Sequence, residues 1–330
     1  MTEQSDKKQV THRQHWLPRT SYLQNFTVDG KVKTYWFGDK GRADFLHTAD
    51  QKDIAPVNIA VKNNLYETPI LPTNTIEDVL AQIEGAYGEV LEKKIKQGKR
   101  LTEDDHEKIA LYISALENRT IMQQEHLNGF LDQLNETGRA ISLGHNAPDA
   151  ADRWTKQMEA MKEVFFAQAM AVSLEVNKWQ PLDFCFLTPA SYVDIEFITS
   201  DHPVTLTDFA RDNSPFGLNQ WSKTAECVVP ITPKIALFGN RCGITGYKEI
   251  DYNFVREIND RVLRRADKMV ISASPIPEYE GKAIVDRMPQ SLLLEFVKLP
   301  TNGRADKILK AVKAREQAEK AKDVEIKKEP

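Results

Sequence analysis

Residues 75–98, TIEDVLAQIEGAYGEVLEKKIKQG, are central to the fold class because their apolar side chains recur at helical spacing. These side chains lie three and four residues apart, as on one face of an amphipathic helix: Ile76, Val79, Leu80, Ile83, Tyr87, Val90, Leu91 and Ile95. Thr75 followed by Asp78 resembles a capping box, and Gly98 is typical of a helix end. The pattern predicts a long helix that begins at Thr75 and ends before Gly98.

Two more long helices are predicted after this one. Thr102 with Asp105 indicates a second helix start, and the apolar stripe that follows is expected to continue through Leu127 and Leu134 to Gly138. A third helix is predicted over residues 150–177, with Trp154 and several methionine and phenylalanine side chains on its apolar face. We interpret these methionine and aromatic stripes as core packing rather than as a cofactor site.

From Asp183 onward the sequence pattern changes to that of strands. Short runs rich in branched and aromatic residues alternate with Pro, Asn, Gly and Ser over residues 184–187, 193–199, 204–206, 227–231 and 235–238. A helix over 253–267 and a strand over 269–272 follow, and an earlier strand over 31–37 comes after an Asp29-Gly30 turn. The order predicts an α+β fold, with long N-terminal helices packed on a mainly antiparallel C-terminal sheet and a charged C-terminal tail.

The domain organisation follows from composition. Residues 1–10 are polar and unpatterned, which favours disorder, and residues 301–330 form a Lys/Glu/Ala-rich tail that is expected to be exposed or partly helical. No Gly-, Ser- or Pro-rich linker separates the helical part (about 75–177) from the sheet part (about 183–273). We therefore expect a single domain over residues 11–300.

Composition and motif searches exclude several classes of protein. The chain has 330 residues, of which 41% are hydrophobic and 28% charged, as in ordinary globular proteins. Cys185, Cys227 and Cys242 have no CxxC or His-linked spacing, so three reduced, buried thiols are expected. No apolar leader or membrane-length run is found, which predicts a cytoplasmic protein without membrane contact. The absence of Walker, HExxH and GxSxG patterns makes a P-loop NTPase, a zincin and an α/β-hydrolase improbable.

Charge is unevenly distributed along the chain. Residues 7–42 contain eight basic residues and two acidic ones, a net charge of +6, whereas residues 43–302 carry −11. A basic end on an acidic body suits a polyanion, so a nucleic acid or a nucleotide is a candidate partner. The alternative is a solvated surface that only aids solubility.

Four polar residues are candidate site residues: His15, Glu84, Arg119 and Asp201. His15 precedes a short helical segment and could serve as a metal ligand or general base, or simply bond a loop carbonyl. Glu84 lies beside the apolar stripe of its helix and needs a partner if buried. Arg119 could pair with Glu84 or hold a phosphate. Asp201 follows an apolar stretch and is either a site carboxylate at a strand end or the centre of an Asx-turn in its own loop.

The chain resembles the domain-of-unknown-function 4238 family in a series of short motifs that occur in order between about Thr11 and Ser274. These motifs are His15-Trp-Leu-Pro18 with Tyr22-Leu23, Ile83-Glu84-Gly85, Arg119-Thr120, Phe197-Ile-Thr-Ser-Asp201-His-Pro203-Val204, Val229-Pro230-Ile-Thr-Pro233, and Asn259 with Ala266. The family pattern has a small polar residue between the Asp and the Pro of the turn, where this chain has His202, so no role is carried over to that side chain. The resemblance implies the extent of the fold and the choice of residues, and no activity.

Two functional hypotheses follow. The first is a metal-assisted hydrolase of nucleic acid or nucleotide phosphodiesters, in which His15, Glu84 and Asp201 supply ligands or a base for a divalent metal and Arg119 stabilises developing negative charge. The second is a non-catalytic binding or interaction module, in stress response or phage defence, in which the same residues form internal ion pairs and turn caps. The first hypothesis requires the four side chains to converge on one cleft.

Overall fold

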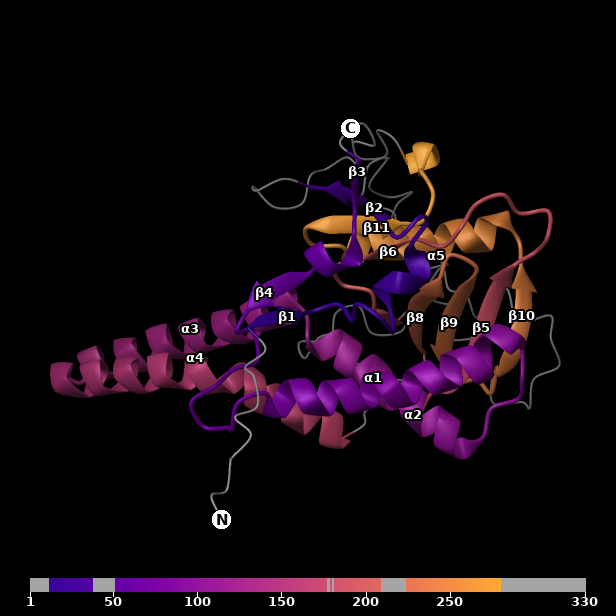
Figure 1. The fold of residues 1–330 in the computed structure, drawn as a ribbon. Coiled ribbons are helices and arrows are strands. Elements are labelled where there is room, and N and C mark those ends of the chain that lie inside the picture. Colours follow the sequence, from indigo (N-terminus) through magenta and orange to yellow (C-terminus); the bar gives the residue numbers. More distant parts are fainter. Residues whose placement is uncertain (1–11, 38–50, 177–178, 180, 209–223, 280–330) are drawn as a thin grey trace, which may run out of the picture.

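The structure is a computed structural model that describes residues 12–37, 51–176, 179, 181–208 and 224–279. The segments 1–10 and 301–330, for which tails were predicted, lie outside the described residues. Long helices lie below two antiparallel-rich sheets, and a two-helix hairpin extends away from the rest of the fold (Figure 1). The predicted α+β class is confirmed.

The helical part contains four long helices: α1 (Thr75–Lys93), α2 (Glu103–Asn118), α3 (Ile121–Gly144) and α4 (Pro148–Val176). The short 3-10 helix η4 (Ile95–Gln97) follows α1 and ends at Gly98, whose φ of 62° suits a residue without a Cβ. The helices α3 and α4 form the extended hairpin (Figure 1). Toward the turn that joins these two helices, the indole of Trp154 lies against the backbone of Gly138.

Two details of the predicted helices are wrong. The second helix does not continue to Gly138 but ends at Asn118, and α3 begins after Thr120, whose hydroxyl accepts the N–H of Gln123. The apolar stripe continues across this break, so helical periodicity does not reveal it. The expected capping box at Thr75 is also absent, since the Thr75 hydroxyl donates to the Pro72 carbonyl, whereas the box at Thr102 and Asp105 is confirmed.

The five-stranded sheet has the order β10-β5-β9-β8-β7. Its strands are β5 (Asp183–Pro189), β7 (Thr205–Asp208), β8 (Ala225–Thr232), β9 (Ile235–Asn240) and β10 (Gly246–Ile250). All neighbours are antiparallel except β5 and β10, which are parallel. Strand β10 was not predicted, because GYKEI combines a glycine with two charged residues and has weak strand propensity.

The four-stranded sheet combines both ends of the described chain, so the sheet region is not purely C-terminal. Its order is β3-β2-β11-β6, with β3 (Lys52–Ile54), β2 (Val32–Trp36), β11 (Met269–Ser272) and β6 (Thr199–Ser200), all antiparallel. Helix α5 (Tyr252–Arg265) packs against β6. The remaining elements are the strand pair β1 (Arg13–His15) and β4 (Val61–Asn63) and the 3-10 helices η1 (Leu23–Phe26), η3 (Pro56–Asn58) and η5 (Pro277–Tyr279).

The predicted strand over 193–199 is wrong except at its end, where Thr199 joins β6. Side-chain and loop partners take the place of a strand ladder in this stretch. The Asn259 side chain accepts the N–H of Ile198 and donates to the carbonyl of Glu196, while Phe197 N–H donates to the Pro233 carbonyl. Because these partners satisfy the buried backbone, the stretch stays irregular although its side chains are apolar.

The turn predicted at Asp29-Gly30 is confirmed. Both residues have positive φ, 50° and 73°, and Val28 and Lys31 exchange backbone hydrogen bonds across the turn. This pairing of positive φ values is the geometry that an Asp-Gly sequence favours in tight hairpins.

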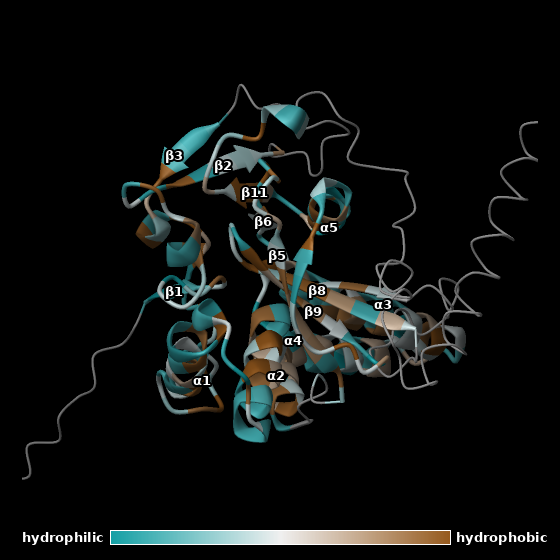
Figure 2. Cartoon of the chain, turned by 90° about the vertical axis from the view of Figure 1, so that its right-hand side faces the viewer, coloured by the Kyte–Doolittle hydropathy of each residue, from teal (hydrophilic) through white to brown (hydrophobic). Residues whose placement is uncertain are grey.

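A large buried apolar cluster joins the helical part to the five-stranded sheet. It includes Leu80 of α1, Ile109 of α2, Met170 of α4, Phe184 of β5 and Val229 of β8. Figure 2 shows hydrophobic residues on α2 and α4 where these helices lie next to the sheet. A shared core is what a single domain requires. The extent of that domain, residues 11–300, stays a prediction.

The cysteines lie where the sequence analysis expected them, inside the protein. Cys185, Cys227 and Cys242 are all buried free thiols, as predicted. Burial raises the pKa of Cys185 to about 12 and that of Cys242 to about 11. In the described part of the chain, none of the helices combines the length and the apolar character needed to cross a membrane.

Candidate functional site

Arg119 occupies the break between α2 and α3, where it ends the first helix. Its side chain is buried, and each of its nitrogens has a partner. Nη1 lies 2.5 Å from Oε1 of Glu84, Nε donates to the Tyr66 hydroxyl at 3.1 Å, and Nη2 donates to the His15 carbonyl at 2.6 Å. The pairing of Arg119 with Glu84, one of two alternatives left by the sequence, is the arrangement observed.

Glu84 uses both of its carboxylate oxygens in this cluster. Oε2 accepts the hydroxyl of Ser21 at 3.3 Å, and the same hydroxyl lies 3.2 Å from that of Tyr112. Tyr112 in turn stacks on Tyr87, with ring centroids 3.7 Å apart. The Glu84 side chain is 22% exposed, so it lies at the edge of the core, as expected from its place beside the apolar stripe.

Two opposing effects set the pKa values of the groups around Arg119: burial of each group and the positive charge of the guanidinium. Burial raises the pKa of Tyr66 to about 12, and the Arg119 charge opposes this rise. Burial also raises the pKa of Glu77, again against the pull of Arg119. Burial alone would lower the pKa of Arg119, but Tyr66 and Glu84 outweigh it, so the pKa of Arg119 is raised. The guanidinium therefore stays charged at any physiological pH.

His15 takes part in the cluster through its backbone rather than its ring. Its carbonyl accepts both Arg119 Nη2 and, at 3.0 Å, the Tyr66 hydroxyl. The ring is half-buried, and its Nε2 atom is buried without a hydrogen-bond partner among the described residues. Burial lowers the pKa of His15, and the nearby charges of Arg19, Arg119 and Arg13 lower it further.

Asp201 ties the end of β6 to the start of β11. Oδ1 accepts the N–H of Asp267 at 3.0 Å, and Oδ2 accepts that of Lys268 at 2.7 Å. The Asx-turn alternative is therefore wrong in its partner, because Asp201 caps a distant loop while Ser200 Oγ accepts the N–H of His202 within its own. Burial raises the pKa of Asp201 to about 6, although the backbone N–H groups oppose this rise.

His202 links the Asp201 turn to the helix break. Its Nδ1 lies 3.2 Å from the hydroxyl of Thr120, the residue after Arg119. The side chain is fully buried, and Nε2 has no hydrogen-bond partner in the described part of the chain. Burial, helped by the charges of Arg265 and His126, holds the pKa of His202 well below its usual value. The sequence marked this residue only as a departure from the family pattern and predicted no role for its side chain.

The structure brings three of the four candidate residues together. His15, Glu84 and Arg119 share direct hydrogen bonds, while the Asp201 carboxylate is directed to the backbone of β11 and joins them only through its neighbour His202. Within the described ranges, no group of three or more His, Cys, Asp or Glu side chains is arranged to hold a metal ion. We call the set His15, Tyr66, Glu84, Arg119, Thr120 and His202 the polar junction.

A family model described as "Protein of unknown function (DUF4238)" matches residues 13–275, most of the chain. The chain belongs to this family. No curated protein and no solved structure matches the chain of this DUF4238 protein.

The other family-like motifs of this DUF4238 protein also serve hydrogen bonding between elements. The Tyr22 hydroxyl lies 2.6 Å from Thr199 Oγ1 and donates to the Pro230 carbonyl at 2.7 Å. Asn259 holds the 196–198 backbone as described above. These motifs thus supply hydrogen bonds that hold separate elements of the fold together.

Proposed function

We propose that this DUF4238 protein is a non-catalytic binding module that recognises the phosphate groups of a nucleic acid. The main support is that the candidate carboxylates are already engaged. Glu84 is bonded to Arg119 and Ser21, and Asp201 accepts two backbone N–H groups. A carboxylate held in this way stabilises the fold and has little freedom to bind a metal or to transfer a proton.

The proposed contact is a basic surface made of Arg13, Arg19 and Lys62 around the β1–β4 strand pair. Arg13 and Lys62 lie on the paired strands β1 and β4, one register position apart, so their side chains extend from opposite faces of this narrow strand pair. Arg19 is close enough to lower the pKa of His15. Both arginines and Lys62 are exposed. In the described residues none of the three has an acidic partner: Arg13 donates to the Val57 carbonyl, and Lys62 to the Gln124 side chain. Cations that are exposed and not neutralised are the groups that contact phosphates.

The charge balance around this surface supports the same proposal. Within residues 12–37 and 51–67 there are six Lys or Arg residues against three Asp or Glu residues. Among these, Lys33 is paired with Asp53, whereas the cations of the basic surface are not. Of the other five cations, three lie on β1, on β4 and in the segment after His15, whereas Lys31 and Lys52 lie at β2 and β3.

The proposal is tested by fluorescence anisotropy with labelled single- and double-stranded DNA and RNA at several salt concentrations. The variant Arg13→Ala/Arg19→Ala/Lys62→Ala is compared with Arg139→Ala/Arg153→Ala/Lys156→Ala, which removes the same charge from exposed positions on α3 and α4. We expect the first variant to bind at least about tenfold more weakly and with a shallower salt dependence, since each lost duplex phosphate contact reduces the slope by roughly 0.9. Equal affinity of the two variants, or no binding by the wild type, would refute the proposal.

The second candidate function is metal-assisted hydrolysis of phosphodiesters. The observation that favours it is the unpartnered Nε2 of His15, a buried nitrogen beside three arginines that would act as a ligand or a general base only once it is exposed. This function requires Glu84 to leave Arg119 and Asp201 to release its backbone partners. Cleavage of a labelled oligonucleotide with Mg²⁺, Mn²⁺ or Zn²⁺, lost in His15→Ala and retained in His12→Ala, would favour it over the binding module.

A further inference from the structure

A pocket of about 500 Å³ lies at the beginning of α2, and none of the polar-junction residues lines it. Three segments form its walls: residues 98–103 with His106 of α2, residues 183–186 of β5, and residues 245–247 at the start of β10. This volume is within the range of sites that bind small molecules. The segments are far apart in the sequence, which is why no local motif indicated the pocket.

Aromatic side chains make up one side of the pocket. Phe186 and Tyr247 occupy paired positions on the parallel strands β5 and β10 and stack with centroids 5.3 Å apart. Phe184 and His106 form a second stack at 4.4 Å. The two phenylalanines are almost fully buried, whereas His106 and Tyr247 are half-buried. His106 and Tyr247 are therefore the rings that a ligand would contact.

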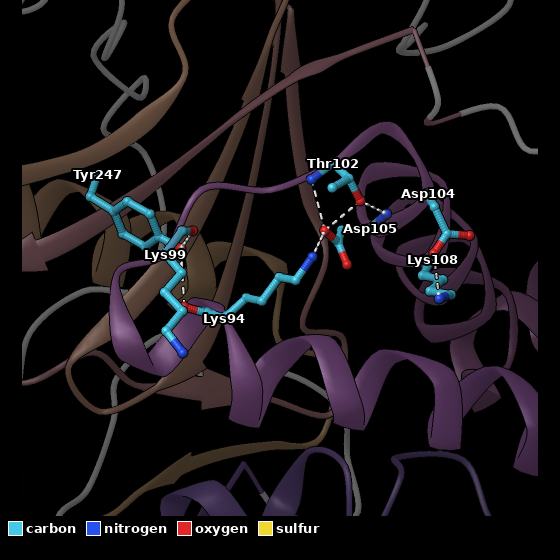
Figure 3. A network of polar contacts seen from close by, with 7 residues as sticks. All are labelled: Lys94, Lys99, Thr102, Asp104, Asp105, Lys108 and Tyr247. Carbon is cyan, nitrogen blue, oxygen red and sulfur yellow. Dashed lines mark hydrogen bonds and ion pairs between the residues drawn. The ribbon is translucent and has the colours of Figure 1, made fainter.

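The segment that closes the pocket is held at both ends. The Tyr247 hydroxyl donates to the Lys99 carbonyl at 2.8 Å, and Thr102 and Asp105 form the capping box of α2. Lys94 reaches from the end of α1 to the Asp105 carboxylate, as Figure 3 shows. These contacts fix the wall before any ligand arrives, which lowers the entropic cost of binding.

The polar groups of the pocket include both signs of charge. Arg100 and Glu103 are exposed, and neither has an ion-pair partner among the described residues. Asp183 accepts the Gly243 N–H with one of its carboxylate oxygens. His106 Nε2 lies 2.7 Å from the Leu182 carbonyl and must donate to it, so Nδ1 is the ring nitrogen that is left for a ligand.

We infer that the pocket between α2, β5 and β10 binds a free amino acid with an aromatic side chain. The ligand's ring contacts His106 and Tyr247, its carboxylate pairs with Arg100, and its ammonium group pairs with Glu103 and Asp183. A zwitterion satisfies both signs of charge at once, which neither a simple anion nor a simple cation does. The inference is independent of the proposed nucleic-acid contact, which lies on β1 and β4.

Calorimetric titration with L-tryptophan, L-tryptophan amide and N-acetyl-L-tryptophan tests this inference. The amide lacks the carboxylate and the acetylated form lacks the ammonium group, so each is expected to bind at least about tenfold more weakly than L-tryptophan. Arg100→Ala should weaken L-tryptophan binding about tenfold and leave amide binding unchanged. Glu103→Gln/Asp183→Asn should weaken L-tryptophan binding and leave N-acetyl-L-tryptophan binding unchanged.

Two further variants separate the pocket from general surface effects. Thr245→Phe places a ring in the pocket and should abolish binding, whereas Asp104→Asn removes a neighbouring charge that pairs with Lys108 outside the pocket and should have no effect. Thermal melts confirm that each variant is folded. Absence of binding by L-tryptophan at millimolar concentration, binding that Thr245→Phe does not change, or amide binding as tight as that of L-tryptophan would each overturn the inference.

Discussion

The buried ion pair of the polar junction predicts strong energetic coupling between Glu84 and Arg119. Arg119→Met removes a guanidinium whose side chain is 2% exposed and leaves Glu84 without its cation, so we expect a loss of about 3–5 kcal/mol in the free energy of unfolding. Glu84→Gln leaves the buried Arg119 charged but still bonded to Tyr66 and His15. Because Glu84 is partly exposed, a smaller loss of roughly 2–3 kcal/mol is expected.

The double variant Glu84→Gln/Arg119→Met has neither charge in the junction. Its stability loss should be smaller than the sum of the two single losses by about 1–3 kcal/mol, which is the range of coupling for residues in one hydrogen-bonded network. The assay is urea unfolding followed by circular dichroism at pH 7. The control is Glu89→Gln, since Glu89 and Lys93 form an exposed pair on the same helix and should contribute no measurable stability.

An additive double variant would refute this reasoning. If the single losses sum to the double loss within about 0.5 kcal/mol, Glu84 and Arg119 do not act as a pair in solution. If Glu84→Gln has wild-type stability but loses metal-dependent oligonucleotide cleavage, the carboxylate serves catalysis rather than architecture. That second result would support the hydrolase over the binding module.

Three further predictions concern other parts of the fold. Gly138→Ala should destabilise the protein by about 1–3 kcal/mol, because its Cβ would lie 2.3 Å from Nε1 of Trp154. Gly129→Ala has open space around its new Cβ and should stabilise the protein by up to about 1 kcal/mol. Thermal melts of both variants check these two effects. The folded-state pKa of Asp201 is raised to about 6, so the stability that its protonated form contributes is complete below about pH 4 and is lost as the pH rises through 6. Urea unfolding from pH 4 to 7 should show that the wild type loses up to roughly 3 kcal/mol of unfolding free energy relative to Asp201→Asn. The buried thiols, with pKa values of about 12 for Cys185 and 11 for Cys242, should react with a disulfide reagent only after denaturation, and rapid reaction of the native protein would contradict their burial.

Local sequence patterns were sufficient to predict most helices and several strands. Apolar side chains at helical spacing mark α1 and α4, and short branched runs mark β8, β9 and β11, because the period of burial differs between a helix and a strand. The same reading predicted that Glu84 needs a partner, since a carboxylate beside a buried stripe is costly alone. These inferences depend only on neighbours within a few residues along the chain.

The tertiary structure alone decided how these elements combine. Arg119 lies at a helix break that periodicity does not show, Asp201 caps a loop 66 residues away, and Asn259 keeps the stretch before Thr199 out of a sheet. Strand β2, with β3 on its other side, pairs with β11 from the other end of the described chain, and β10 pairs with β5 despite its weak strand propensity. The pocket beside α2 likewise exists only where three distant segments meet. In each case the deciding partner is distant in sequence, so its hydrogen bond or contact leaves no local pattern to read.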